Sequence, residues 1–183
     1  MVEIIGHGDI ASALFKAAES SVGLKEGRVY IAAGVSNPNP LPESEYQREK
    51  ELLIQLAQRK DLQDLQVVYF STLRIDAQVR YSQHKMEMEG LVKSLFPHYT
   101  IARLGIITWG DNPHTTIGFL RERVIRREPF KVREVTRDVV ELDGFIQQVN
   151  RIPRSNCVVE IHGQVMTERE IFRKYVSADY PLP

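Results

Sequence analysis

Apolar positions along the chain fall into short β-branched runs that alternate with longer amphipathic stretches. The runs predict buried strands, and the stretches repeat apolar residues at helical spacing, so they predict helices. The predicted strands cover residues 2–5, 28–33, 66–71, part of 99–108, and 158–161. The predicted helices cover residues 9–19, 43–59, 82–96, 115–127 and 138–151, and a capping-box pattern at residue 167 opens a last one.

Strands that alternate with helices favour an α/β fold, in which helices cover both faces of a parallel sheet. No internal repeat, low-complexity segment or long linker divides the 183 residues, a length that suits a single domain. We therefore expect one Rossmann-like domain over residues 1–183. Its core lies in residues 1–110, and residues 111–183 form a reduced region on the substrate side.

Composition excludes several classes of protein. Hydrophobic residues make up 43% of the chain and charged residues 26%. This hydrophobic content allows a packed core and is higher than that of a disordered chain. The 24 basic residues balance the 24 acidic ones, so we expect neither nucleic-acid binding nor a basic membrane anchor. A single cysteine excludes a disulfide framework, and no apolar run is long enough to span a membrane. The expectation is a cytoplasmic protein without a metal site.

The first chemical motif is a glycine turn between the first predicted strand and the first predicted helix. Gly6 permits a tight turn, Gly8 lets the backbone approach a pyrophosphate, and the small Ala11 lets helix and strand touch. Unpaired N–H groups at the helix N-terminus then face the phosphates. A turn that serves only strand–helix packing is the alternative. The residues predicted to contact a dinucleotide here are Gly6, His7, Gly8, Asp9 and Ile10.

The second motif is a Y-x-x-x-K pattern formed by Tyr81 and Lys85. Their spacing places both side chains on one helix face, where an ammonium can lower the pKa of a phenol from about 10 toward the working pH. Chance matches to this spacing are common, so a helix-surface pair is the alternative. A predicted strand ends in Ser71 and Thr72 just before this helix. Because parallel strands end at the ligand crevice, we expect Thr72 to contact the substrate oxygen that Tyr81 protonates.

Together and in this order, these motifs resemble the extended branch of the short-chain dehydrogenase/reductase superfamily, the nucleotide-sugar epimerases and dehydratases. The resemblance runs along nearly the whole chain and implies NAD or NADP as cofactor and a nucleotide sugar as substrate. It implies that Thr72, Tyr81 and Lys85 are catalytic and that Lys85 also binds the nicotinamide ribose. Other residues placed by the resemblance are Ala32, Ala33 and Ser71 near the cofactor, Glu89 further along the Tyr–Lys helix, and Arg137 near the phosphates of the substrate.

The chain departs from the family after the first helix. About nine residues separate Glu19 from the strand at Val29, too few for the family's next strand–helix–strand unit. The expected fold is therefore a truncated, Rossmann-like doubly wound parallel sheet that lacks the second and third strands. No acidic residue stands where the family grips the adenosine ribose. Ile106 stands where the family commonly has an asparagine, and Gly144 where it often has an aspartate.

Three functions stay open on these observations. The first is an NAD(P)-dependent enzyme acting on a nucleotide sugar. The second, motivated by the missing ribose contact, is a non-catalytic binding protein or partner subunit on a degenerate scaffold. The third is a site that binds a sugar nucleotide or mononucleotide without any redox step. The resemblance also implies a homodimer, formed through the helices at 43–59 and 82–96.

Overall fold

Five parallel strands form the main sheet of the computed structural model, which describes residues 1–37, 39 and 41–180. Their spatial order is β1-β2-β3-β4-β7. The strands are β1 (Val2–Ile5), β2 (Arg28–Ile31), β3 (Gln66–Thr72), β4 (Tyr99–Leu104) and β7 (Cys157–Ile161). The central strands β2 and β3 are buried along almost their whole length, as expected for strands covered on both faces.

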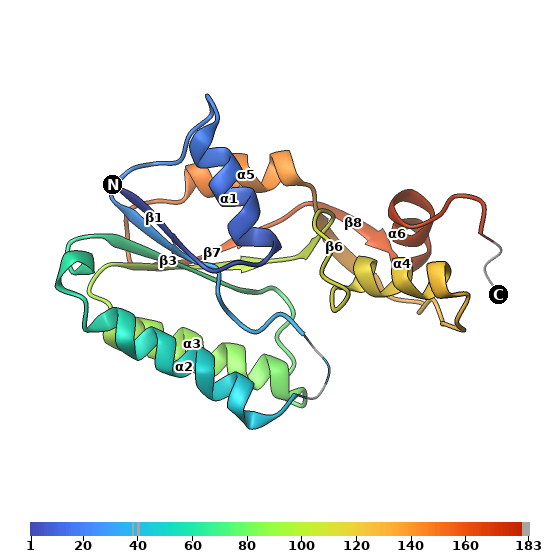
Figure 1. The fold of residues 1–183 in the computed structure, drawn as a ribbon, viewed down its shortest axis with the longest axis horizontal. Helices are drawn as coiled ribbons and strands as arrows, with labels where there is room; N and C mark the ends of the chain where they lie inside the picture. Colours follow the sequence, from blue (N-terminus) through green and yellow to red (C-terminus); the bar gives the residue numbers. More distant parts are fainter. Residues whose placement is uncertain (38, 40, 181–183) are drawn as a thin grey trace.

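Helices cover both faces of this sheet (Figure 1). On one face lie α1 (Asp9–Glu19) and α5 (Leu142–Arg151), and on the other lie α2 (Glu43–Ala57) and α3 (Arg80–Leu95). A short 3-10 helix, η1 (Lys60–Leu62), leads from α2 toward β3. This layering confirms the predicted α/β class. None of the helices described here is both long and apolar enough to cross a membrane.

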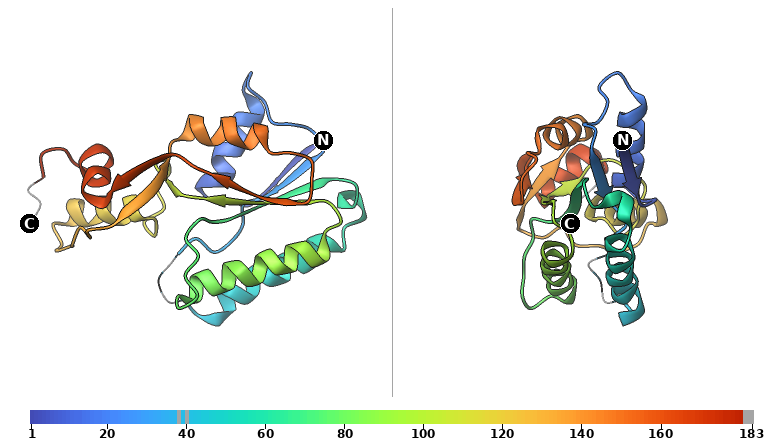
Figure 2. Two further views of the ribbon diagram at one scale, coloured as in Figure 1. Left: turned by 180° about the vertical axis from the view of Figure 1, so that it is seen from behind. Right: turned by 90° about the vertical axis from the view of Figure 1, so that its left-hand side faces the viewer.

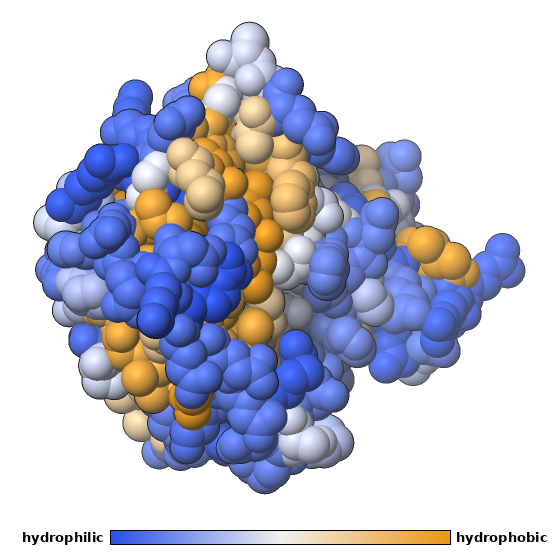
Figure 3. Space-filling model, turned by 60° about the vertical axis from the view of Figure 1, so that its left-hand side comes forward, coloured by the Kyte–Doolittle hydropathy of each residue, from blue (hydrophilic) through white to orange (hydrophobic). Residues whose placement is uncertain are grey.

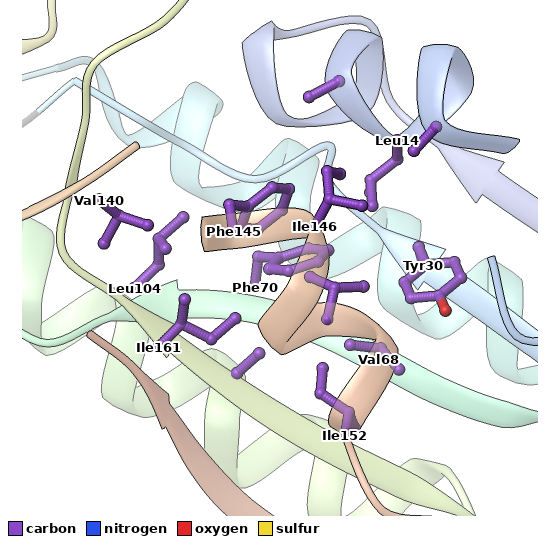
Figure 4. Packing of buried hydrophobic residues seen from close by; sticks show 14 residues of the cluster. Leu14, Tyr30, Val68, Phe70, Leu104, Val140, Phe145, Ile146, Ile152 and Ile161 are labelled. Atoms are coloured by element: carbon purple, nitrogen blue, oxygen red, sulfur yellow. The ribbon is translucent and has the colours of Figure 1, made fainter. Parts of the chain in front are cut away.

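The core beneath α1 and α5 is built around aromatic side chains (Figure 4). Phe70 of β3 lies between Tyr30 of β2 and Phe145 of α5, with ring centroids 6.5 and 5.6 Å apart. Leu14 and Ile146 fill the space between the two helices and the sheet. A second apolar cluster packs α2 and α3 against the opposite face. Because burying one such side chain contributes about 1.5–3 kcal/mol, the two clusters hold the three layers together.

A smaller, second sheet extends from one end of the main sheet (Figure 2). In it β6 pairs in parallel with β5 and antiparallel with β8. The elements of this region are β5 (Ile106–Ile107), α4 (Thr116–Arg126), β6 (Thr136–Val140), β8 (Gln164–Thr167) and α6 (Glu168–Tyr175). The capping box predicted at Thr167 is present and opens α6. Residues after 110 thus contribute to both sheets, since β7 joins the main one.

The helix predicted over 138–151 is wrong in its first part. Asp138, Val139 and Val140 belong to strand β6, and the helix begins only at Leu142. Val139 and Val140 are buried β-branched residues that pack in the second sheet, and Glu141 has extended backbone angles that separate strand from helix. The sequence analysis also missed β8 and did not separate β5 from β4.

Strand β1 lies at the edge of the main sheet. Within the described residues it pairs only with β2, and the link from Glu19 to Arg28 contains no helix or strand. This confirms that the second and third strands of the doubly wound sheet are absent. Exposed apolar side chains in this part of the chain include Phe15 and Val22. Figure 3, which brings the left-hand side of Figure 1 forward, shows an apolar band bordered by hydrophilic residues.

Candidate active site

A cleft of about 320 Å³ opens at the carboxyl ends of β1, β2 and β3. Its walls come from the glycine turn, the loop after β2, the end of β3 and the first turns of α3, with residues 107–115 opposite. Open α/β sheets bind their ligands at this end of the strands. The volume is at the small end of the roughly 300–1,000 Å³ that small-molecule sites occupy.

Another hollow, of about 390 Å³, lies between residues 25–28 and 151–154, at the amino ends of the strands. It is lined by none of the residues that the sequence predicts to be functional. The buried Arg28 there donates hydrogen bonds to the carbonyl groups of Val149 and Ile152 at 3.3 and 2.5 Å, so it closes the end of α5. The predicted chemistry therefore belongs to the cleft at the carboxyl ends.

The glycine turn has the geometry that its sequence predicts. Gly6 has φ +135°, and a Cβ atom there would lie 2.4 Å from the carbonyl oxygen of Ala32, so no other residue fits. Around Gly8, by contrast, no atom lies within 4 Å of the Cβ position. Gly8 is the N-cap of α1, and no side chain caps that helix end. The turn can therefore offer N–H groups of the first helical turn to an anion.

His7, Asp9 and Ile10 also line the cleft, as predicted for the glycine turn. The Asp9 carboxylate accepts a hydrogen bond from the backbone N–H of Asn112 at 3.3 Å, and its carbonyl oxygen accepts one from Trp109 Nε1 at 3.1 Å. Asp9 therefore fixes the facing wall to the turn. His7 is exposed at the mouth of the cleft.

The structure brings the three predicted catalytic residues together. Tyr81 and Lys85 both line the cleft, and the side chain of Thr72 lies close enough to the phenol of Tyr81 to lower its pKa. Thr72 itself is not part of the lining; its Oγ1 also accepts a hydrogen bond from the backbone N–H of Arg74 at 3.1 Å. Lys85 Nζ donates to Tyr69 Oη at 3.2 Å.

Glu49 of α2 is the functional residue that sequence reasoning missed. Its carboxylate is 1% exposed and lies behind the cleft, where Lys85 Nζ donates to its Oε1 at 3.0 Å. A Cβ atom on Gly34, in the loop after β2, would lie 2.4 Å from both of these atoms. The backbone of that loop therefore packs directly on the Glu49–Lys85 ion pair. The only signal in the sequence was an acidic residue on the buried side of an amphipathic helix.

The pKa of the Glu49 carboxyl lies far below its usual range. Burial by itself would raise this pKa, but the charge of Lys85 and hydrogen bonds from His84, Tyr69 and the Val35 backbone lower it by more. Glu49 is therefore an anion near neutral pH, and it neutralises the charge of Lys85.

The pKa of Tyr81 differs from the sequence expectation. Burial raises it above 10, and the negative charge of Glu49 adds to the rise. Lys85 and the side chain of Thr72 act in the opposite direction but do not outweigh burial. In the unliganded chain Tyr81 is therefore a protonated phenol near neutral pH, because burial outweighs the effect of Lys85.

The alanines and the serine predicted to lie near a cofactor also line the cleft. Ala32 and Ala33 follow β2 directly, and Ser71 sits at the end of β3. The Ser71 hydroxyl donates to Glu89 Oε1 at 2.7 Å, and Arg103 holds the same carboxylate with bonds of 3.0 and 2.8 Å. Ser71 thus donates its hydroxyl proton within the protein, and its oxygen can still accept a hydrogen bond.

Arg137 lies apart from the cleft lining, on β6 of the second sheet. Its guanidinium bonds to the buried Glu168 at 3.4 Å. Burial lowers the pKa of Arg137, and the neighbouring Arg74 and Arg133 add to this effect. The cluster therefore carries more positive than negative charge. Among the described residues, no group of three or more His, Cys, Asp or Glu side chains is placed to hold a metal ion.

Comparison with known proteins gives a match only at the level of structure. No family model and no curated protein matches the sequence. The enzyme WbmH of Bordetella bronchiseptica, in complex with NAD+, matches with a TM-score of 0.73 and 14% identity over 100% of this chain and 83% of its own. WbmG of the same organism, in complex with NAD, matches with a TM-score of 0.69 and 13% identity over 100% and 80%.

A third solved structure, UDP-N-acetylglucosamine 4-epimerase from Bacillus cereus, matches with a TM-score of 0.69 and 12% identity over 93% of this chain and 78% of its own. The chain has the Rossmann-like α/β fold of these solved structures. The resemblance seen in the sequence motifs is thereby confirmed for the fold. This fold is present here in a truncated form, since the matches span nearly all of this chain and about four fifths of the others.

Proposed function

We propose that the chain is an NAD(P)-dependent enzyme that acts on a nucleotide sugar, as an epimerase, dehydratase or reductase. One observation carries the proposal. Tyr81, with Thr72 and Lys85 beside it, lines the same cleft as an uncapped glycine turn at a helix N-terminus. Solved structures of the same fold, crystallised with NAD or NAD+, support it.

Each of the three side chains has a chemical role in this proposal. The phenol of Tyr81 exchanges a proton with a hydroxyl group of the sugar, and the Thr72 hydroxyl orients the same oxygen. Lys85 has three N–H donors, of which Glu49 and Tyr69 accept two, so one remains for a ribose hydroxyl. The dinucleotide, when bound, supplies a hydride acceptor or donor for the sugar carbon.

The residues present fit one half of a dinucleotide better than the other. The glycine turn offers backbone donors to a pyrophosphate, and Ala32 and Ala33 leave room beside it because their side chains are small. Neither a second strand nor a carboxylate at its end is present to grip the adenosine ribose. Losing such a charged hydrogen bond, worth about 1.5–3 kcal/mol, weakens binding roughly 10- to 150-fold. We therefore expect weak cofactor binding.

The open edge at β1 favours a second candidate, a partner subunit or binding protein that keeps the cleft without turnover. Its motivation is that the missing strands would normally complete the site on the β1 side. A mutation separates the two functions. Tyr81→Phe abolishes an activity that depends on proton transfer, whereas it leaves a binding role in place.

The proposal includes a homodimer formed through α2 and α3. The two helices lie side by side on one face of the sheet (Figure 1). Each carries a large apolar side chain exposed to solvent, Ile54 at 36% and Met86 at 46%. Two copies of this helix pair would bury both side chains in a four-helix contact.

Native mass spectrometry of the protein as purified, and after addition of NAD or NADP, tests the proposal. We expect the mass of a dimer and of a complex with one dinucleotide per chain. With UDP-sugars added, Tyr81→Phe keeps the bound dinucleotide and loses turnover by at least a hundredfold. Tyr99→Phe, at the amino end of β4, is the matched control and keeps both. Failure to detect any dinucleotide complex at millimolar NAD and NADP would contradict the enzymatic function.

A further inference from the structure

The Glu49 carboxylate accepts hydrogen bonds from four donors on three different parts of the fold. Oε1 accepts from Tyr69 Oη at 2.6 Å and from Lys85 Nζ at 3.0 Å. Oε2 accepts from the backbone N–H of Val35 at 2.7 Å and from His84 Nε2 at 2.8 Å. The donors come from the loop after β2, from β3 and from α3. Glu49 therefore fixes the position of α3 relative to the strand ends that line the cleft.

The ion pair between Glu49 and Lys85 forms a unit that is buried away from solvent. Glu49 and Lys85 are 1% and 3% exposed, and His84 is 1% exposed. The Lys85 ammonium supplies a formal positive charge to the carboxylate, and a backbone amide, a phenol and an imidazole supply its other hydrogen bonds. A buried carboxylate of this kind is retained only when it is paired and fully hydrogen-bonded. Glu49 meets both conditions within the protein.

The unit lies one helical turn from Tyr81. Residues 81 and 85 are four apart on α3, so their side chains share a face. An unpaired ammonium in that position would attract the phenolate form of Tyr81. Here the same ammonium is held by Glu49 and Tyr69, and the Glu49 charge opposes its effect.

We propose that Glu49 is a positioning residue that holds the Lys85 ammonium in the core and thereby limits the attraction of that charge for the phenolate form of Tyr81. This inference rests on the proposed function for its catalytic meaning, because it gives Tyr81 a direction of proton transfer. The balance of effects on Tyr81 supports it, since burial and Glu49 raise the pKa of the phenol while Lys85 lowers it.

The other ionisable groups around the cluster do not replace Glu49 in this role. From α2, the Tyr46 ring packs on His84 with centroids 4.8 Å apart, and the Arg80 guanidinium lies over the Tyr46 ring at 4.4 Å. Arg80 is itself paired with the exposed Glu43 at 2.9 Å. Among the described residues, Tyr69 is the group of β3 that bonds the carboxylate, and the Val35 backbone amide is the group of the loop after β2 that does so. Arg48 lines the cleft but is exposed and pairs with Glu45.

Titration of tyrosinate absorbance in the protein without ligand tests the inference. The difference between the parent and Tyr81→Phe isolates Tyr81, and the difference between Glu49→Gln and Glu49→Gln/Tyr81→Phe does the same without the carboxylate. An unneutralised charge nearby shifts a pKa by about one to three units, so we expect roughly tenfold or more tyrosinate at a given pH below the midpoint in Glu49→Gln. Glu49→Asp, which keeps the charge, should restore the parental curve.

Glu51→Gln on the exposed side of α2 is the matched control and should leave the Tyr81 curve unchanged. An unchanged Tyr81 curve in folded Glu49→Gln would overturn the inference. If that variant does not fold, the parent can still overturn the inference, which fails if Tyr81 ionises with the exposed tyrosines or before them. No dinucleotide or sugar is present, so absence of cofactor binding would refute the proposed function and leave this result standing.

Discussion

On the α3 side of the cleft, all four hydrogen bonds of the Glu49 carboxylate are made by the protein itself, whereas the β1 side ends in a strand with one neighbour. On the α3 side the hydrogen bonds of this carboxylate are complete without a ligand. On the β1 side, within the described residues, no strand lies beyond β1, and the cleft is lined there by the glycine turn, residues 6–10. The chain therefore contains the elements proposed to carry proton transfer and lacks part of the framework proposed to bind the cofactor.

The comparison indicates that the residues proposed for proton transfer and the elements proposed to bind the cofactor occupy different parts of the fold. Removing one partner of a buried ion pair leaves the other charge buried and unpaired. A peripheral strand and helix can be lost as a unit, since the remaining edge still pairs with β2 along its whole length.

Replacing Glu49 by leucine should have the largest effect on the α3 side. The change leaves Lys85 buried without a counter-charge, so we expect the free energy of unfolding in urea to fall by about 3–5 kcal/mol. Glu51→Leu, the same substitution on the exposed side of α2, should change it by less than about 0.5 kcal/mol. Equal losses in the two variants would mean that the helix surface, rather than the buried pair, determines the result.

A pair of glycine substitutions contrasts the two sides directly. Gly34→Ala places a Cβ atom 2.4 Å from the Glu49 and Lys85 side-chain atoms, and we expect a loss of about 1–3 kcal/mol in stability. Gly8→Ala has no atom within 4 Å of the new carbon and should keep the stability of the parent. Its methyl group projects beside the turn, so NAD binding measured by calorimetry should weaken. Full NAD affinity in Gly8→Ala would remove the glycine turn from the proposed site.

The smallest effect is expected at β1. Arg59 bonds both carboxylate oxygens of Glu3, at 2.6 and 3.0 Å, but both side chains are partly exposed and the pair is screened by solvent. Glu3→Gln should therefore shift the thermal midpoint only slightly in low salt and not at all in high salt. A loss comparable to that of Gly34→Ala would show that the edge strand is more tightly coupled to the core than its burial suggests.

Local sequence patterns predicted most of the fold because they report buried runs and helical spacing. They placed α1 at its observed bounds and the capping box of α6, since each depends on neighbouring residues. They failed at β6, where Val139 and Val140 run directly into an amphipathic helix and the strand partner lies some 25 residues away. The pairing of β6 with β8 cannot be recognised from the pattern of neighbouring residues, because the two strands are far apart in the sequence.

The sequence likewise predicted those parts of the candidate site that depend on neighbouring residues. The glycine turn and the Tyr–Lys spacing are local motifs, and the structure brings them to one cleft. Glu49 could not be found in this way, because an amphipathic helix with several glutamates gives no sign of which one is buried. Its role depends on donors at Val35, Tyr69 and His84, which only folding brings together. The raised pKa of Tyr81 follows from that same convergence.

The unpaired edge of β1 also affects whether copies of the chain can aggregate. Unpaired backbone groups at a sheet edge can template the addition of strands from other chains, the first step toward fibres. Strand β1 presents only four residues to such an incoming strand, and one of them is a carboxylate tethered to Arg59. An added chain would gain few backbone bonds there and would meet a fixed negative charge. Truncation has thus left an edge too short and too charged to seed aggregation.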